Sequence, residues 1–313
     1  MQAVKRTERG VEVVAVDDPE AGADDTVVVE VRSASLCGSD LHLIGFGPLP
    51  VVLGHEFAGV LADGTPVAVD PTNPCGTCAQ CTSGQRHLCR FGTILGVSLD
   101  GGMAERVRVR RGALVPLPAG LPPAHACLVE PTAVSVHGLH LAGITGGERT
   151  AVIGAGSIGL AAVAALADNG AEVHLEARHP AQRDAGERLG ATGPAAGEYD
   201  VVFEAAGTQS AVDRAVELVR PGGLVMFLST FWEGIAMPGF AVAMKEATLR
   251  WAFTQSHHSG GRDVDTAAAL LARRPEIADA LITHRFPLAD APEAFRVAAD
   301  RAHGAIKVVL EPG

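Results

Sequence analysis

The chain has 313 residues, enough for two domains that each bury a core, and its 47% hydrophobic and 19% charged residues are typical of a soluble globular protein. The net charge of −11 argues against a nucleic-acid duplex or an anionic membrane surface as a partner. The sequence contains no apolar run of about 18 residues that could span a membrane, and its N-terminal segment does not resemble a secretory signal. We therefore expect a cytoplasmic protein with neither nucleic acid nor membrane as a partner.

The first third of the chain is rich in strand signals. β-branched runs at 26–34 and 67–69 are bounded by Gly, Pro and Asp, and the segment 101–118 alternates apolar and charged residues as a half-exposed strand does. The proline-rich stretch 116–126 then interrupts the pattern. We expect a β-rich unit that ends within this stretch.

From residue 150 onward, short apolar runs alternate with helical stretches. This alternation predicts an α/β fold, with a doubly wound parallel sheet covered by helices on both faces. The expected strands are 150–156, 172–176, 200–207, 223–229 and 249–253, with helices from Ser157 and near 212–219. Beyond them we expect a helix from Val264 and strands at 283–288 and 304–312.

A glycine-rich turn follows the first of these strands and opens the next helix. It reads Gly154-Ala155-Gly156-Ser157-Ile158-Gly159. In such a turn the first glycine permits the tight bend, the second lets a pyrophosphate approach the backbone, and the third lets helix and strand pack closely. The start of the helix, at Ser157 and Ile158, offers unpaired N–H groups to phosphates. We interpret the turn as a dinucleotide site rather than a structural loop.

The end of the second strand should meet the adenosine ribose, and counting along the chain places this position at Ala177. A small residue followed by Arg178, with Arg183 one helical turn further on, favours the 2′-phosphate of NADP over NAD. Glu176 stands one position earlier, and a shift of one residue would make it an acceptor for the ribose of NAD. Arg178 could also be a solvated loop charge.

Four of the six cysteines are crowded into one short segment. Cys75, Cys78, Cys81 and Cys89 have the spacing C-x2-C-x2-C-x7-C, and four thiolates so close together can surround one zinc ion. Because such a site leaves no open coordination position, its role is structural. His87 is a competing donor, and an iron–sulfur cluster or unpaired core thiols are the chemical alternatives.

A second group of donors has the composition of a catalytic zinc site. Cys37 supplies a thiolate, His55 an imidazole, and Glu56 or Glu130 a carboxylate. Three protein ligands with a fourth position open to substrate describe a zinc that acts as a Lewis acid on an alcohol or carbonyl oxygen. The alternative is that Cys37 is a small buried residue and that His55 and Glu56 form a surface pair.

These motifs together resemble the zinc-containing medium-chain dehydrogenase/reductase family, in the branch that includes sorbitol, threonine and related polyol dehydrogenases. The resemblance runs through nearly the whole chain. It is carried by CGSDLH (37–42), GHEFAG (54–59), the four cysteines, EPTAVSVH (130–137), GAGSIG (154–159), THRFPL (283–288) and GAIKVVLEP (304–312).

The resemblance implies Cys37, His55 and Glu56 as ligands of the catalytic zinc. Glu130 would bind the zinc directly or through water, at a position where classical alcohol dehydrogenases have a cysteine. The thiolates of the cysteine segment would hold the structural zinc.

The resemblance also implies roles for three residues near Cys37. Ser39 would hydrogen-bond the reacting oxygen and pass its proton through the cofactor ribose to His42 and solvent. Asp40 would orient the zinc-binding histidine.

The resemblance implies a Rossmann-type domain beside a β-rich GroES-like catalytic domain. We expect the catalytic domain at 1–121, the dinucleotide-binding domain at 122–258, and a C-terminal return at 259–313 that completes the catalytic domain. Only a short segment separates Gly190 from Asp200, so we expect the parallel sheet to lack a strand and a helix on one side. The family further implies a homodimer or homotetramer built partly by pairing of the strand near 249–254.

The function expected from these features is reversible hydride transfer between NADP(H) or NAD(H) and an alcohol or polyol, or its ketone or aldehyde. Two alternatives remain at this stage. The same fold could reduce an activated C=C or C=N bond, or it could be a non-catalytic NADPH-binding sensor or scaffold.

Overall fold

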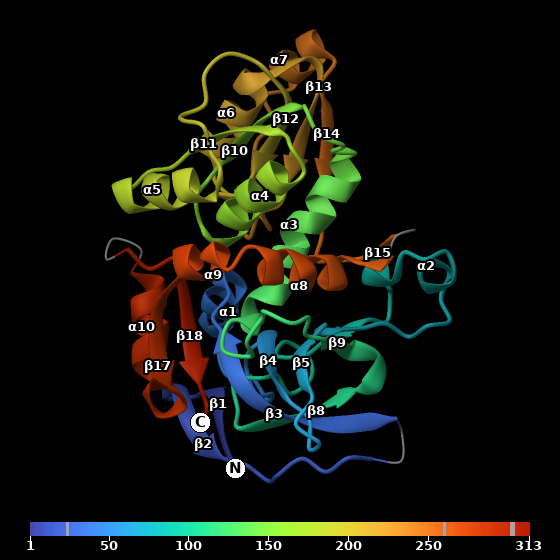
Figure 1. The fold of residues 1–313 in the computed structure, drawn as a ribbon, viewed down its shortest axis with the longest axis vertical. Helices are drawn as coiled ribbons and strands as arrows, with labels where there is room; N and C mark the ends of the chain where they lie inside the picture. Colours follow the sequence, from blue (N-terminus) through green and yellow to red (C-terminus); the bar gives the residue numbers. More distant parts are fainter. Residues whose placement is uncertain (23–24, 259–260, 301–303) are drawn as a thin grey trace. The chain divides into compact units, whose positions relative to one another are not determined.

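The protein is described here by a computed structural model that covers residues 1–22, 25–258, 261–300 and 304–313 (Figure 1). The chain divides into two compact units. Unit 1 comprises Met1–Glu130 and Ser256–Gly313, and unit 2 comprises Pro131–Gln255. The domain boundaries expected after residues 121 and 258 stay predictions.

Unit 1 is built on a seven-stranded sheet in the order β17-β18-β3-β4-β5-β9, with β8 paired to β3. Its long strand β3 forms where β-branched residues alternate with polar ones. Val29 and Val31 are buried in the core, whereas Glu30 between them is exposed. The strands are β3 Thr26–Ser35, β4 Glu56–Val60, β5 Pro66–Val69, β8 Arg106–Arg110, β9 Leu114–Pro116, β17 Ile282–Pro287 and β18 Lys307–Glu311.

Smaller elements surround this sheet. The two-stranded sheets are β1 Gln2–Thr7 with β2 Gly10–Ala15, β6 Thr72–Asn73 with β7 Thr93–Ile94, and β15 His257–His258 with β16 Gly261–Arg262. The helices are α1 Gly38–Leu43, α2 Ala79–Thr82, α8 Asp263–Arg273, α9 Glu276–Leu281 and α10 Ala291–Ala299, with short 3-10 turns at Ile44–Phe46, Arg86–Leu88, Arg111–Ala113, Ala126–Leu128 and Leu288–Asp290.

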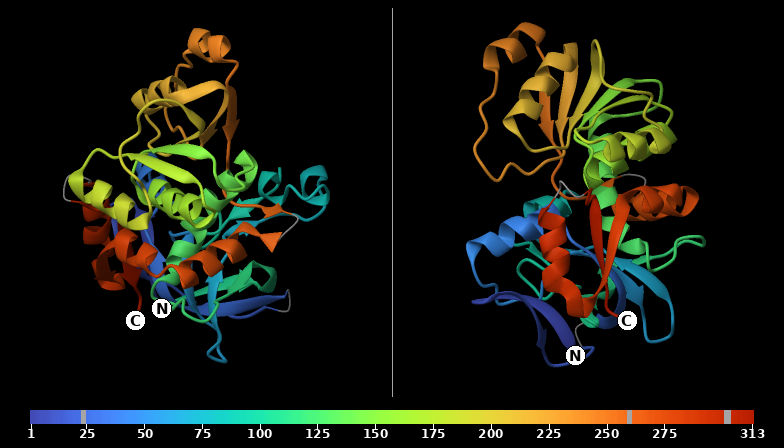
Figure 2. Two further views of the ribbon diagram at one scale, coloured as in Figure 1. Left: turned by 45° about the horizontal axis from the view of Figure 1, so that its top comes forward. Right: turned by 90° about the vertical axis from the view of Figure 1, so that its left-hand side faces the viewer.

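Unit 2 contains a five-stranded parallel sheet in the order β11-β10-β12-β13-β14, as the alternating pattern predicts. Helices α4 and α5 pack against one face of the sheet and α6 against the other (Figure 2). The elements are β10 Arg149–Ile153, α4 Ser157–Asp168, β11 Glu172–Glu176, α5 Pro180–Leu189, β12 Tyr199–Glu204, α6 Gln209–Leu218, β13 Val219–Phe227, α7 Gly239–Lys245 and β14 Thr248–Trp251, preceded by α3 Val129–Ala142.

The sheet of unit 2 ends at β11, and the chain crosses from α5 to β12 without a further helix or strand. The crossing segment 190–198 lies along the outer edge of β11. Thr192 N donates to Val173 O at 2.8 Å, and Leu175 N donates to Gly193 O at 2.9 Å. The shortened sheet expected from the sequence is therefore present, and backbone hydrogen bonds cover part of its edge.

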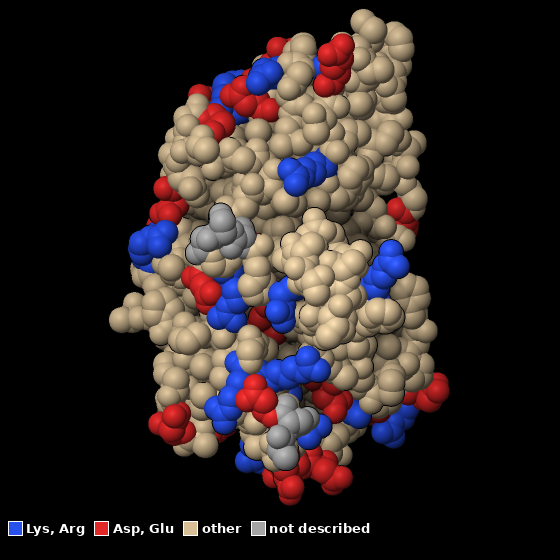
Figure 3. Space-filling model, turned by 90° about the vertical axis from the view of Figure 1, so that its right-hand side faces the viewer, with Lys and Arg blue, Asp and Glu red and all other residues tan. Residues whose placement is uncertain are grey.

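Charged side chains of both signs are interspersed on the face drawn in Figure 3, in keeping with a net charge that is not gathered into one patch there. Among the described residues, no helix has the length and apolar character needed to cross a membrane.

Candidate functional site

Cys37, His55 and Glu56 come together in unit 1. Their side-chain donor atoms all lie within 4.8 Å of one another. Cys37 is the N-cap residue of α1, whereas Glu56 is the first residue of β4 and His55 immediately precedes it. Gly54 has a φ of +93°, and a Cβ atom there would lie 2.5 Å from the Met103 side chain, so only glycine fits the turn that presents His55.

Asp40 connects Cys37 to His55. One carboxylate oxygen accepts a hydrogen bond from Cys37 N at 2.9 Å, and the other faces His55 Nδ1 at 3.4 Å. Burial lowers the pKa of His55, but the charges of Asp40 and Cys37 more than offset this and raise it well above its ordinary value. The second imidazole nitrogen, Nε2, is turned away from Asp40 and lies 3.3 Å from Ser39 Oγ. This arrangement fits a histidine that is oriented by a carboxylate while its other nitrogen is presented to a metal.

Glu56 is fully buried and paired with Lys307, which is only 2% exposed. Lys307 Nζ donates to both carboxylate oxygens, at 2.9 and 2.7 Å, and to Leu36 O at 3.1 Å. Ser35 Oγ donates a further hydrogen bond to Glu56. The carboxylate is thus held rigidly beside Cys37 and His55, and the lysine offsets its charge.

Glu130 lies in the first turn of α3, is 7% exposed and is not a member of the three-residue group. Burial raises the pKa of its carboxyl to about 8, and the nearby charge of Glu56 acts in the same direction, while His55 and Lys307 oppose it. Because its carboxyl group lies outside the cluster of Cys37, His55 and Glu56, Glu130 fits a secondary metal ligand better than a primary one.

Ser39 and His42 both lie on α1. Ser39 is half-buried beside His55, whereas His42, one turn further along the helix, is exposed. The three residues predicted to serve the proton route and the zinc histidine, Ser39, Asp40 and His42, thus lie on one short helix, and their assigned roles stay predictions.

The four cysteines of the segment 75–89, which we call the cysteine lobe, also converge. Their sulfur atoms lie within 4.8 Å of one another, with 4.0 Å between Cys75 and Cys81 and 3.7 Å between Cys78 and Cys89. Four sulfurs placed tetrahedrally at a Zn–S distance of about 2.3 Å would be roughly 3.8 Å apart. The sulfur spacing therefore fits a zinc ion without rearrangement.

Backbone N–H groups point at the sulfurs of the cysteine lobe. Cys78 N donates to Cys75 Sγ at 3.4 Å, and Cys75 N donates to Cys89 Sγ at 3.3 Å. Hydrogen bonds from Thr77 and Cys78 lower the pKa of Cys75 to about 6, which favours the thiolate form that binds metal. The competing donor His87 is not part of the group, and its Nδ1 lies 2.7 Å from Ser256 Oγ.

The glycine loop of unit 2 has the geometry of a phosphate cradle. A Cβ atom at Gly159 would lie 1.8 Å from Gly154 O, and Gly154 itself has a φ of +103°, so both positions require glycine. At Gly156, in contrast, an added Cβ would meet nothing within 4 Å. The backbone at Gly156 is therefore open for a ligand to approach, and the loop leads directly into α4, which begins at Ser157.

Beyond β11, Ala177 is half-buried, and Arg178 and Arg183 are exposed. Arg183 Nη1 donates to Ala177 O at 3.3 Å, so α5 brings this side chain back to the end of the strand. The structure thus brings the Arg183 side chain to the position expected to meet the ribose, and Arg178 follows this position directly in the chain.

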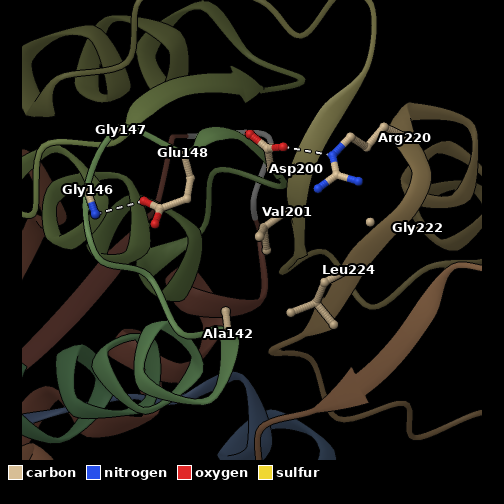
Figure 4. A pocket seen from close by; sticks show the side chains of 10 residues that line it. Ala142, Gly146, Gly147, Glu148, Asp200, Val201, Arg220, Gly222 and Leu224 are labelled. Atoms are coloured by element: carbon tan, nitrogen blue, oxygen red, sulfur yellow. Dashed lines mark hydrogen bonds and ion pairs between the residues drawn. The ribbon is translucent and has the colours of Figure 1, made fainter.

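A surface hollow of about 500 Å³ lies elsewhere in unit 2, lined by Ala142, Gly146, Gly147, Glu148, Asp200, Val201, Arg220, Gly222, Gly223 and Leu224 (Figure 4). The charged groups that line it interact with one another or with the backbone of the hollow. Arg220 pairs with Asp200 at 2.8 Å, and Glu148 accepts a hydrogen bond from Gly146 N. Glu148 precedes β10 and Asp200 lies near the start of β12, so the hollow is at the opposite end of the strands from the glycine loop. It is not the dinucleotide site.

Comparison with known proteins identifies the family. Residues 23–119 match the alcohol dehydrogenase GroES-like domain, and residues 123–311 match the glucose dehydrogenase C-terminus. The L-galactonate-5-dehydrogenase of Escherichia coli is 32% identical over 302 residues, with 87% of each chain covered. The chain belongs to the zinc-type medium-chain dehydrogenase/reductase family. The predicted resemblance to its sorbitol and threonine dehydrogenase branch is confirmed.

Two further relatives are similar to this zinc-type dehydrogenase over nearly its whole length. The D-altritol 5-dehydrogenase of Agrobacterium fabrum is 33% identical over 326 residues and covers 93% of this chain and 94% of its own. A zinc-binding dehydrogenase of Sinorhizobium meliloti, solved with NADP bound, superposes with a TM-score of 0.90 at 31% identity over 99% of both chains. The predicted combination of a GroES-like and a Rossmann-type fold is confirmed, and the chain is an oxidoreductase. The two alternative functions are not favoured.

Sequence reasoning missed Lys307 as a neighbour of the candidate metal-binding group. The signal was present, because Lys307 interrupts the otherwise apolar run 305–310 of the sequence, and a lysine must be paired when it is buried. Its partner could not be identified without the fold, because Glu56 is 251 positions away.

Proposed function

We propose that this zinc-type dehydrogenase interconverts a polyol or related alcohol and its ketone or aldehyde, with NADP(H) preferred to NAD(H). The observation that carries the proposal is the convergence of Cys37, His55 and Glu56, with Asp40 behind the histidine. The names of L-galactonate-5-dehydrogenase and D-altritol 5-dehydrogenase support a polyhydroxy substrate. The NADP bound to the Sinorhizobium meliloti relative supports the cofactor.

In this proposal Cys37, His55 and Glu56 hold a catalytic zinc, and Glu130 binds it directly or through a water molecule. When bound, zinc supplies a Lewis acid to the substrate oxygen and the nicotinamide exchanges the hydride. Lys307 keeps Glu56 in place, and Asp40 fixes the imidazole of His55.

Ser39 and His42 are the proposed route for the proton. The Ser39 hydroxyl lies 3.3 Å from His55 Nε2, so it is close enough to the proposed metal ligands to hydrogen-bond the substrate hydroxyl. His42 is exposed on the same helix and would exchange the proton with solvent.

The cysteine lobe would hold a second, structural zinc. The lobe contains only the short helix α2 and a 3-10 turn, and Cys81 is its one buried cysteine. With so little apolar surface of its own, the segment needs the metal to keep its shape.

The six free cysteines also support the predicted cytoplasmic location.

In unit 2, the backbone at Gly154, Gly156, Ser157, Ile158 and Gly159 would bind the pyrophosphate. Ala177 would lie against the adenosine ribose, and Arg178 and Arg183 would contact the 2′-phosphate.

We also propose a homodimer or homotetramer that uses the edge of the unit 2 sheet. Among the residues that the structure describes, strand β14 pairs with β13 alone, and Trp251 and Phe253 near its end are 46% and 49% exposed. Phe240 and Met244 on the preceding helix α7 are 83% and 70% exposed. An unpaired strand edge beside apolar side chains suits association with a second copy of the chain.

Metal analysis combined with cofactor binding tests the central proposal. The intact protein should contain two zinc ions per chain and oxidise a polyol with NADP+. Cys37→Ser and His55→Ala should each lose one zinc and turnover while NADPH still binds, and Cys89→Ser should lose the other zinc. Cys127→Ala, which alters a buried cysteine outside both groups, is the matched control and should keep both ions. Full activity in Cys37→Ser, or a single zinc confined to the cysteine lobe, would contradict the proposal.

A further inference from the structure

Strand β11 ends at Glu176, directly beside the glycine loop. Ile153 of β10 pairs with Glu176 in the parallel register, and Gly154 N donates to Glu176 O at 3.0 Å. In dinucleotide-binding folds, an acidic residue near the end of this strand accepts hydrogen bonds from the ribose of NAD. Glu176 therefore has the chemistry of an NAD enzyme at a site where we propose that NADP(H) binds.

The carboxylate of Glu176 is engaged by Arg214, which lies on α6. Arg214 Nε and Nη2 both approach Glu176 Oε1, at 2.8 and 2.7 Å, and the two side chains are only 29% and 30% exposed. A carboxylate that accepts two N–H groups from one guanidinium is held in orientation as well as neutralised.

Arg214 is itself fixed by two further acceptors. Its Nη1 lies 2.9 Å from Glu217 Oε2 one turn along α6, and its Nη2 donates to Ala195 O in the crossing segment. The hydrogen bonds that Arg214 donates to the carboxylates of Glu176 and Glu217 raise the pKa of its guanidinium, which therefore remains charged. The shortened crossing between α5 and β12 thus supplies a backbone acceptor that keeps the arginine against the end of β11.

Two basic residues follow the end of this strand. Arg178 and Arg183 are exposed, and within the part of the chain that the structure describes neither forms an ion pair with Glu176. Because Arg214 offsets the charge of Glu176, Arg178 and Arg183 are the charged groups next to Ala177 that are left to meet a ligand.

We propose that Arg214 is a positioning residue for cofactor choice: its ion pair withholds the Glu176 carboxylate from the ribose hydroxyls and leaves Arg178 and Arg183 to bind a 2′-phosphate. The inference rests on the proposed function, because it requires that unit 2 binds a nicotinamide dinucleotide. Without Arg214, the carboxylate would accept hydrogen bonds from the ribose diol of NADH and would repel the 2′-phosphate of NADPH.

The test compares dissociation constants of NADPH and NADH for the zinc-loaded protein, followed by nicotinamide fluorescence. Wild type should prefer NADPH, and Arg214→Met should shift the ratio of the two constants towards NADH by roughly tenfold or more. Glu176→Gln in the Arg214→Met background should restore the wild-type preference, because it removes the charge that was released. Glu217→Gln is the matched control, since it removes another partner of Arg214 but leaves the pair with Glu176, and it should shift the ratio by less than about threefold.

Binding of 2′,5′-ADP and 5′-AMP provides a second readout that a merely structural role would not move. Arg214→Met should weaken 2′,5′-ADP far more than 5′-AMP. Equal weakening of both ligands, a ratio that stays shifted in the double variant, or a wild type that prefers NADH would each overturn the inference while leaving dinucleotide binding intact. A wild type that binds neither NADPH nor NADH would overturn the proposed function itself.

Discussion

Replacing Lys307 with methionine should destabilise unit 1 strongly, because it leaves the carboxylate of Glu56 buried without its cation. Glu56 is 0% and Lys307 2% exposed, and the ammonium group lies 2.9 and 2.7 Å from the two carboxylate oxygens. Removing one partner of such a pair costs roughly 3–5 kcal/mol. At about 2–4 °C per kcal/mol for a unit of this size, the unfolding midpoint should fall by roughly 6–20 °C.

A more exposed ion pair that also involves strand β18 provides the control. Arg285 on β17 and Glu311 on β18 form an ion pair at 2.6 Å, but their side chains are 33% and 44% exposed. Arg285→Met should therefore reduce the free energy of unfolding by no more than about 1 kcal/mol. The contrast between the two variants isolates the effect of burial.

The measurement is thermal and urea unfolding of the metal-free protein, followed by circular dichroism and calorimetry. Both tryptophans, Trp232 and Trp251, lie in unit 2, so intrinsic fluorescence reports on that unit and serves as an internal reference. The double variant Lys307→Met with Glu56→Gln should recover most of the loss, since no buried charge remains unpaired. If Lys307→Met were no more destabilising than Arg285→Met, the reasoning from buried charge would be refuted.

Three other predictions concern the glycine loop, Glu130 and the cysteine lobe. Gly159→Ala should destabilise unit 2 and abolish NADPH binding, because the added Cβ would lie 1.8 Å from Gly154 O. Gly156→Ala should keep the unfolding midpoint but weaken the binding of NADPH, because its Cβ would meet no protein atom within 4 Å. Equal unfolding midpoints for the two variants would contradict this reasoning. Because burial raises the pKa of Glu130 from 4.5 to about 8, the metal-free folded state binds a proton that the unfolded state has lost, so stability should fall as pH rises between these values. Glu130→Gln should flatten that pH profile in urea titrations, and an unchanged slope would show that another group is responsible. Chelation of zinc should make the cysteine lobe sensitive to trypsin before the rest of the chain, as followed by mass spectrometry of the fragments, and simultaneous cleavage elsewhere would argue against a metal-supported lobe.

Local signals in the sequence were sufficient for much of the fold. The strands and helices of unit 2 were predicted because apolar runs and helical stretches alternate, and the elements β10, α4 and β11 lie where this pattern placed them. The short helix α1 was not predicted, since its six residues are too few to show a helical period. Its position nevertheless decides the site, because it carries Ser39, Asp40 and His42 on one element.

The contacts around the candidate zinc site show where sequence reasoning ended. Cys37 and His55 could be paired as donors from chemistry and resemblance, but whether Glu56 or Glu130 would join them was left open. The structure places Glu56 in the donor group and Glu130 outside it, since β4 presents His55 and Glu56 together while Glu130 comes from the start of α3. The third-ligand assignment itself stays a prediction until metal binding is measured.

By itself, the sequence determined the features whose parts are neighbours along the chain. These are the glycine loop between strand and helix, and the cysteine lobe, whose four cysteines all lie within the segment 75–89. Only the tertiary structure decided which distant charges meet, as Lys307 meets Glu56 and Arg214 meets Glu176. The physical reason is that a local motif is specified by backbone conformations over a few residues, whereas an ion pair between remote segments depends on how strands are ordered and which side chains their packing buries.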